Sequence, residues 1–200
     1  FVDLALEQKN SLVNGPFGSN LLTSELHDAG VPVLYIQDIR NGRFERKSSR
    51  HVTQEKASEL TMCGVVPGDV LIAKVGDPPG AAAIYPQGNE PAIVTQDVVR
   101  IRVNQNVGTP EYIAEFMNSS IGQNWLAPII VEATRSRFGL GEIKKRELLL
   151  PPIEMQKKFS SIYDHVTSQR KTLLCTKEEA NALFNSLTQR TFGTAGIKAA

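Results

Sequence analysis

The stretch "ELLLPPIEMQKKF" (residues 147–159) decides how this chain is organised. An apolar run, Leu148 to Leu150, ends at two prolines, and a charged sequence that favours helix begins at once. Proline disfavours helix in the residue before it and lacks a backbone N–H, so the two prolines separate the apolar run from the charged sequence. The sequence therefore predicts a joint, at which a strand in residues 146–152 closes a globular part and a helix begins.

The sequence after the joint predicts one long helix. After Ile153 the sequence contains no proline, and its first glycine there is Gly193. Steps of three and four residues from Phe159 trace an apolar seam with polar interruptions, which is typical of a coiled coil. The apolar seam positions are Phe159, Ile162, Val166, Leu173, Ala180, Leu183 and Leu187. A helix over 154–191 would be about 57 Å long. It would exceed the diameter of a 150-residue domain, so we expect it to protrude or to pair.

Composition limits the class of protein. With 200 residues, 41% hydrophobic and 22% charged, the chain suits one packed domain with an appendage. No apolar run approaches the ~18 residues of a membrane span, and no signal-peptide pattern occurs at the start. Cys63 and Cys175 are far apart, and His27, His51 and His165 have no ligand-like spacing. We expect a soluble cytoplasmic protein without a metal, a cofactor or a membrane segment.

The first 152 residues predict a mixed α/β fold (α+β). Strand-like runs alternate with short helical patterns: strands at 31–39, 66–76, 80–86 and 92–103, and helices at 53–60 and 109–120 with a second one through Trp125. The 66–76 and 80–86 strands form a hairpin across a turn at 77–80. Thr53 and Thr109 are N-cap residues for the helices. Arg100 and Arg102 lie on one side of the 92–103 strand, where they face solvent or pair with acids.

Basic residues gather in two windows of this part, although the net charge of the whole chain is only +1. The windows hold Arg40, Arg43, Arg46, Lys47 and Arg50, and then Arg135, Arg137, Lys144, Lys145 and Arg146. Local clustering on an otherwise neutral domain is typical of a nucleic-acid-binding groove, but a solvated basic face has the same composition.

Polar side chains suited to bases and phosphates suggest where DNA would be contacted. Arginine and lysine match the acceptors of guanine, and glutamine matches adenine. We expect Arg135 and Arg137, in the polar loop "TRSRF" (134–138), to contact phosphate or guanine. Gln96 would contact adenine and Lys74 phosphate; Ser19 and Arg40 form a second tier. Gln37 and Gln96, inside predicted strands, have the alternative of satisfying backbone groups, and Phe138 belongs to the core.

Catalytic patterns are incomplete. "GDPPG" (76–80) resembles the Asp-Pro-Pro-aromatic motif of amino-methyltransferases, but Gly80 stands where an aromatic would stack on an extruded base. "EIK" (142–144), with Asp69 or Asp97 upstream, resembles half of a metal-dependent nuclease site, but Glu-x-Lys occurs by chance in many proteins of this length. No phosphate-binding glycine loop is present, and no histidine lies near Ser19 in the sequence. The pattern favours a reader of DNA over a catalyst.

Taken together, the chain resembles one half of a specificity (S) subunit of a type I restriction-modification system. The resemblance covers nearly all 200 residues, as the order and spacing of six stretches. These are "GPFGSNL" (15–21), "GVPVLYIQDIRNGRF" (30–44), "GDVLIAKVGDPPGAAAI" (68–84), "IVTQDVVRIR" (93–102), "ATRSRFGLGEIKKRELLLPPIEMQKKF" (133–159) and "LFNSLTQRTFG" (183–193). "PPIEMQ" is similar to the Pro-Pro-Leu-Glu-Glu-Gln of the family, with Met155 in place of the second Glu.

The resemblance implies a target-recognition domain at 1–152, a conserved spacer helix at 153–192 and a flexible tail at 193–200. Family members read a split target in double-stranded DNA with two such domains, held apart by two antiparallel helices. They perform no chemistry themselves but recruit modification subunits, which methylate adenine, and restriction subunits, which cut DNA. No internal repeat is present, so this chain holds one half, and we expect its helix to pair with a second copy or with the other half.

Two other classes of function stay open. One is a scaffold whose globular part binds protein, which predicts weak DNA binding that is indifferent to sequence. The other is a methyltransferase or nuclease that acts alone, which predicts activity of the purified chain that is lost on Glu142→Ala or Asp77→Ala.

Overall fold

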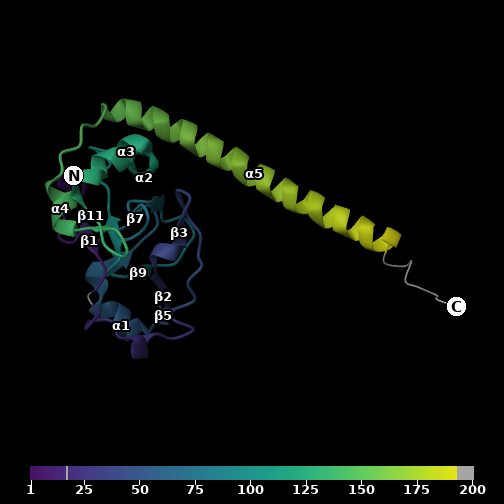
Figure 1. Ribbon diagram of the computed structural model, residues 1–200, viewed down its shortest axis with the longest axis horizontal. Helices are drawn as coiled ribbons and strands as arrows, with labels where there is room; N and C mark the ends of the chain where they lie inside the picture. The colour runs from purple at the N-terminus through teal and green to yellow at the C-terminus, as the bar shows by residue number, and fades with distance from the viewer. Residues whose placement is uncertain (17, 193–200) are drawn as a thin grey trace. The chain divides into compact units, whose positions relative to one another are not determined.

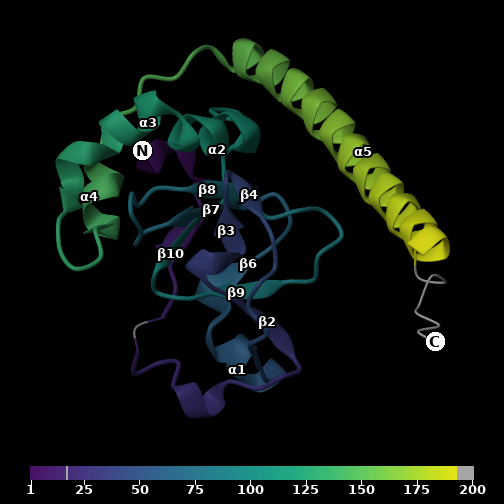
Figure 2. The ribbon, with the colours of Figure 1, turned by 45° about the vertical axis from the view of Figure 1, so that its right-hand side comes forward.

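The computed structural model of the chain describes residues 1–16 and 18–192 (Figures 1 and 2). Phe1–Lys157 form one compact unit, and a second begins at Lys158 with the remainder of helix α5 (Ile153–Phe192). The expected mixed α/β fold with a long C-terminal helix is confirmed. The tail expected at 193–200 lies outside the described residues. No described helix, α5 included, has the length and hydropathy of a membrane span.

A four-stranded antiparallel sheet lies at the centre of the first unit. Its strands, in spatial order, are β1 (Leu12–Asn14), β10 (Val98–Ile101), β7 (Val70–Ala73) and β8 (Ala82–Ile84). Alternate residues of a strand point to opposite faces. In β7, Val70 and Ile72 join one apolar cluster, whereas Leu71 and Ala73 join another. All four are buried because both faces of the sheet are covered.

Helices cover the first face. They are α2 (Pro110–Asn118), α3 (Ser120–Leu126) and α4 (Leu140–Lys145), with the 3₁₀ turns η1 (Val2–Leu4) and η5 (Ala127–Ile129). Figure 2 shows α2 across β7 and β8, which it contacts. The helix begins as predicted, because the Thr109 hydroxyl accepts a hydrogen bond from the Tyr112 N–H and a proline follows the cap. Its buried face includes Ile113 and Met117.

A second sheet covers the other face. Its strands, in spatial order, are β5 (His51–Val52), β2 (Val31–Leu34), β9 (Ala92–Val94) and β6 (Gly64–Val65), with β2 and β9 parallel. Helix α1 (Gln54–Glu59) begins at the predicted cap, Thr53. The remaining pairs are β3 (Ile39–Arg40) with β4 (Arg43–Phe44), and β11 (Ile130–Val131) with β12 (Arg137–Phe138). The other 3₁₀ turns are η2 (Thr23–Glu25), η3 (Ile36–Asp38) and η4 (Thr61–Cys63).

The prediction of one strand over 92–103 is wrong. Residues 92–94 form β9 in the second sheet, and residues 98–101 form β10 in the first. A turn separates them, closed by the hydrogen bond from the Val98 N–H to the Thr95 carbonyl (3.0 Å). Thr95 also donates its backbone N–H to the Leu34 carbonyl of β2 (3.0 Å). The chain therefore crosses between the two sheets within three residues.

Two further strand predictions need correction. The strand expected at 31–39 ends at Leu34, because the Asp38 carboxylate accepts a hydrogen bond from the Tyr35 N–H (2.8 Å) and closes the turn η3. Residues 146–152 form no strand. Their contacts include the hydrogen bond from the Trp125 indole N–H to the Glu147 carbonyl (2.7 Å) and the one from the Arg146 side chain to the Trp125 carbonyl (2.6 Å). Within this stretch Leu149 is 96% exposed.

The first turn of α5 belongs to the first unit, and Gln156 fastens it there. The Gln156 side chain is completely buried. Its oxygen accepts from the Thr109 N–H (3.1 Å), and its amide donates to the carbonyls of Val107 (3.2 Å) and Pro151 (2.9 Å). One glutamine thus joins the start of α5, the double proline and the cap of α2.

Gln156→Ala is expected to lower the free energy of unfolding of the first unit by about 3 kcal/mol, because buried polar groups lose their partners. Urea unfolding followed by the fluorescence of Trp125 measures this loss. Met155→Ala is the matched control in the same turn, since Met155 is 60% exposed. Equal, small losses for the two variants would contradict the role given to Gln156.

Candidate nucleic-acid interface

Two distant segments flank Lys74, directly after β7. The Lys74 N–H donates to the Asp97 carbonyl (2.8 Å), and the Lys74 carbonyl accepts from the Phe138 N–H (3.2 Å). The Gly76 N–H donates to the Ser136 carbonyl (3.0 Å). The turn at 95–97 and the segment 134–138 are therefore brought together at the end of β7.

The "TRSRF" segment carries the two arginines expected to contact DNA. Arg135 is exposed in the segment, whereas Arg137, expected in the same loop, belongs to the short strand β12 and forms an antiparallel bridge with Val75. Its side chain is exposed, whereas Phe138 beside it is 1% exposed and lies in the core, as predicted. Because neighbouring residues of β12 point to opposite faces, burial of Phe138 directs the Arg137 side chain outward.

Gln96 lies in the turn between β9 and β10 and is exposed, so its expected place inside a strand is wrong. The Gln96 carbonyl accepts from the side-chain amide of Asn14 (3.3 Å), and the Gly15 N–H donates to the Thr95 carbonyl (3.1 Å). A Cβ on Gly15 would lie 2.0 Å from the Val94 carbonyl oxygen, so only glycine permits this approach. The segment after β1 is thereby held against the turn.

The charges around Lys74 form a compact set. Burial lowers the pKa of the partly buried Lys74 ammonium, the carboxylate of Asp97 raises it, and the guanidinium of Arg137 lowers it. Two cations therefore lie within electrostatic reach of each other beside one acid. A phosphate group bound here would interact favourably with both Lys74 and Arg137, because Asp97 alone balances only one of their two positive charges.

The structure unites some of the predicted contact residues but not all. Lys74, Gln96 and Arg137 lie on adjoining segments, with Arg135 two residues along the chain from Arg137. Ser19 is exposed in the segment after Gly15, and Arg40 is exposed on β3. In the described chain, no hydrogen bond joins either of them to the other four. Gln37 is exposed in η3, outside any strand.

Sequence reasoning missed two residues of this neighbourhood. Asn14 connects the segment after β1 to the Gln96 carbonyl, and Asp97 is the acid beside Lys74. The dipeptide Asn14-Gly15 is a sequence signal for a tight backbone approach. The sequence suggested Asp97 only as a metal ligand.

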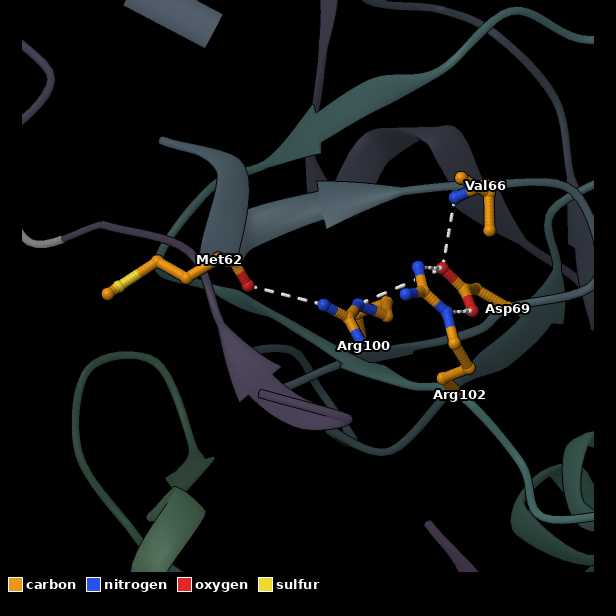
Figure 3. A network of polar contacts seen from close by, with 5 residues as sticks. All are labelled: Met62, Val66, Asp69, Arg100 and Arg102. Carbon is orange, nitrogen blue, oxygen red and sulfur yellow. Dashed lines mark hydrogen bonds and ion pairs between the residues drawn. The ribbon is translucent and has the colours of Figure 1, made fainter. Parts of the chain in front are cut away.

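Arg100 and Arg102, in contrast, form ion pairs with the buried Asp69 inside the first unit. Figure 3 shows both arginines joined to the carboxylate of Asp69. Its carboxylate accepts two hydrogen bonds from Arg102 (2.9 and 2.8 Å) and one from the Val66 N–H (2.9 Å), and its Oδ2 lies 3.8 Å from Nε of Arg100. Both arginines pair with an acid, which was one of the two expectations for them. Arg100 does not face solvent, since it is only 2% exposed and donates to the Met62 carbonyl (3.2 Å).

The residues of the two enzyme hypotheses are engaged elsewhere. Asp69 is the acid of the buried network, and Glu142 pairs with Lys145 on α4 (2.9 Å). Gly80 has a φ of +105°, and a Cβ there would lie 2.5 Å from a methyl group of Leu126, so an aromatic residue does not fit. Within residues 1–16 and 18–192, no three His, Cys, Asp or Glu side chains gather as a metal-binding group.

A known protein resembles most of this chain in sequence. No protein-family model matches the chain. The specificity subunit of the type I restriction enzyme EcoBI, from Escherichia coli, is 22% identical over 160 residues, which are 80% of this chain and 33% of that protein. The chain is therefore similar in sequence to part of a type I specificity subunit. It spans about a third of the length of the curated relative that it matches.

Two solved structures share the fold of this chain. A structure that addresses complex assembly and conformational transition of the type I R-M system matches with a TM-score of 0.59 and 17% identity, over 92% of this chain and 42% of that one. The crystal structure of the HsdS subunit from Thermoanaerobacter tengcongensis matches with a TM-score of 0.50 and 15% identity, over 92% of this chain and 41% of that one. This chain therefore has the fold of about two fifths of each of these two chains.

Proposed function

We propose that this chain reads one half of a bipartite DNA target as the specificity component of a type I restriction-modification complex. The observation that carries the proposal is the meeting of Lys74, Gln96 and Arg137 on three adjoining segments, in a chain related to specificity subunits. Lysine and arginine supply phosphate or guanine contacts, and glutamine supplies an adenine contact. Segments held by a rigid sheet are also where binding groups are best positioned.

The chain itself performs no chemistry in this proposal. Methylation and cleavage belong to modification and restriction subunits that it recruits in the cytoplasm. Co-purification of the full chain with a modification subunit tests the recruitment. The helix α5 supplies the second part of the proposal: two copies pair through its apolar seam, so that two recognition units read a symmetric, split target.

Two substitutions separate base reading from phosphate binding. Gln96→Ala is expected to relax discrimination at one base position by about 1–3 kcal/mol and to leave binding to other sequences unchanged. Lys74→Ala is expected to weaken binding to all duplexes alike and to reduce the slope of log affinity against log salt by about 1. The preferred duplex is first selected from a randomised pool with the full chain, and affinities are then measured by fluorescence anisotropy.

Lys56→Ala is the matched control. Lys56 lies on α1 and pairs with Glu25 (2.8 Å) and Glu59 (3.1 Å), so its loss leaves DNA binding unchanged. Applied to Arg135 and Arg137, the same comparison assigns each arginine to a base or to a phosphate. If the wild-type chain binds every duplex with the same weak affinity, it does not read sequence. That result would support the alternative in which the globular part binds protein.

A further inference from the structure

The hairpin of β3 and β4 places two arginines directly opposite each other. Arg40 and Arg43 are register partners across the turn formed by Asn41 and Gly42. Both turn residues have positive φ, 50° and 73°, which is the conformation of a two-residue hairpin turn of the primed type. Directly opposed side chains lie on the same face of the pair, and like charges in that position repel. The hairpin therefore concentrates positive charge at its tip.

Neither arginine is compensated by an acid within the part of the chain that the structure describes. The other three basic residues of the same window are engaged. Arg46 donates to the carbonyls of Val33 (2.9 Å) and Arg50 (3.0 Å), Lys47 pairs with Glu45, and Arg50 pairs with Asp28 (3.3 Å). Three basic residues of the window are therefore engaged within the protein. Arg40 and Arg43 remain available to bind a ligand.

A buried carboxylate makes this hairpin rigid. Asp38, which is fully buried, precedes the hairpin and accepts hydrogen bonds from the residues after it. The donors are the Lys47 N–H (2.7 Å), the Ser48 N–H (2.7 Å) and the Ser48 hydroxyl (2.6 Å). The Asp38 carbonyl also accepts from the Glu45 N–H (2.9 Å). Both ends of the hairpin are therefore tied to one residue.

The tip is also supported from below. A Cβ on Gly42 would lie 2.9 Å from the side-chain amide of Asn118, so the turn rests on the end of α2. Asn118 is itself held by two hydrogen bonds to the backbone of Ala82 in β8 (2.8 and 2.9 Å). Phe44 packs edge-on against Tyr85, with 4.9 Å between ring centres. Little conformational freedom is lost when a ligand binds to an element held this firmly.

We propose that Arg40 and Arg43 bind a phosphate group between them and that its source is the backbone of duplex DNA. A phosphate accepts hydrogen bonds from both guanidinium groups and removes the repulsion between them. The choice of DNA as the source rests on the proposed function. The hairpin would then anchor the duplex, while Lys74, Gln96 and Arg137 face another part of it.

The test uses the full chain and its preferred duplex, with Arg40→Gln and Arg43→Gln combined. Each phosphate contact contributes about 0.9 to the slope of log affinity against log salt, so the slope should fall by about 2. The affinity ratio of wild type to variant should accordingly shrink about tenfold between 50 and 200 mM salt. The matched control is Lys47→Gln with Arg50→Gln, which removes the same charge from the same window and should change the slope far less.

A second readout does not involve DNA. Without ligand, the Arg40→Gln, Arg43→Gln variant should melt at a higher temperature than wild type at low salt, and the difference should vanish near 1 M salt, where charges are screened. Inorganic phosphate should stabilise the wild type but not this variant if the site takes phosphate from any source.

The outcomes separate this inference from the proposed function. Duplex binding that is unchanged in the arginine variant, or changed equally in the control, overturns the hairpin site and leaves DNA reading intact. Loss of binding together with indifference to sequence supports the hairpin site and overturns DNA reading. A wild-type chain that binds no duplex overturns both, and protection by inorganic phosphate alone would then assign the site to a free phosphate compound.

Discussion

Asp69→Ala is expected to lower the free energy of unfolding by about 3–5 kcal/mol, the cost of leaving a buried charge without its partner. Both Asp69 and Arg100 are only 2% exposed. Burial lowers the pKa of Arg100, whereas the negative charge of Asp69 raises it, so the carboxylate offsets part of the cost of burying the guanidinium charge. Without Asp69, Arg100 would keep only its hydrogen bond to the Met62 carbonyl, and the Val66 N–H would lose its acceptor.

Urea unfolding followed by Trp125 fluorescence measures the effect in the first unit. Arg100→Met in the Asp69→Ala background should recover part of the loss, because it removes the unpaired charge and keeps an apolar stem in the same space. Asp28→Ala is the control for an exposed pair, since the Asp28 side chain is 94% exposed and its bond to Arg50 should contribute little. A loss below about 1 kcal/mol for Asp69→Ala would mean that water already solvates this network.

Structural features that depend only on neighbouring residues, such as the starts of helices, were predictable from the sequence. The helix α2 begins where a threonine cap is followed by a proline, and α1 begins at the predicted cap Thr53, because these residues favour the start of a helix by themselves. The long helix likewise results from the double proline and the absence of helix breakers after it. Each of these signals lies within a few residues of the element that it predicts.

Features that depend on distant partners were not predictable. The 92–103 run has the composition of one strand, but its halves pair with different sheets, β9 with β2 and β10 with β1 and β7. Residues 146–152 have the composition of a strand but lack a neighbouring strand to pair with. Arg100 carries the side chain of a surface residue, and only the position of Asp69 explains its burial.

The same division applies to the candidate site. Side-chain chemistry was enough to select Lys74, Gln96 and Arg137, but their meeting depends on hydrogen bonds between segments more than 20 residues apart in the sequence. Arg43 was visible only as a member of a basic window. The register of the hairpin and the acid partners of Lys47 and Arg50 distinguish it from those neighbours.

The second large effect is expected in α5, whose seam positions are open. Leu173 and Leu183 are 69% and 62% exposed in the single chain, and Ile162, Val166 and Leu187 are also exposed. A leucine buried in a helical interface contributes about 1.5–3 kcal/mol. Leu173→Glu with Leu183→Glu would remove four such side chains from a dimer and place four charges in its seam. We therefore expect the wild type to be a dimer at tens of micromolar and this variant to be a monomer.

Ser168→Glu with Asn185→Glu is the matched control, because these polar positions lie on the face of the helix away from the seam and gain the same charge. Light scattering measures the mass of each full-length variant. A chain that ends at Lys157 gives a further comparison, because a shorter one would lose Gln156 and its hydrogen bonds to the first unit.

The result also decides what kind of DNA target to seek. A wild-type dimer that becomes monomeric only when the seam is charged implies two identical reading units, and therefore a target of two symmetric half-sites at a fixed separation. A wild-type monomer would overturn the homodimer. The exposed seam of α5 would then belong to a contact with a different chain, and the two halves of the target would differ in sequence, because a second kind of recognition unit would read one of them.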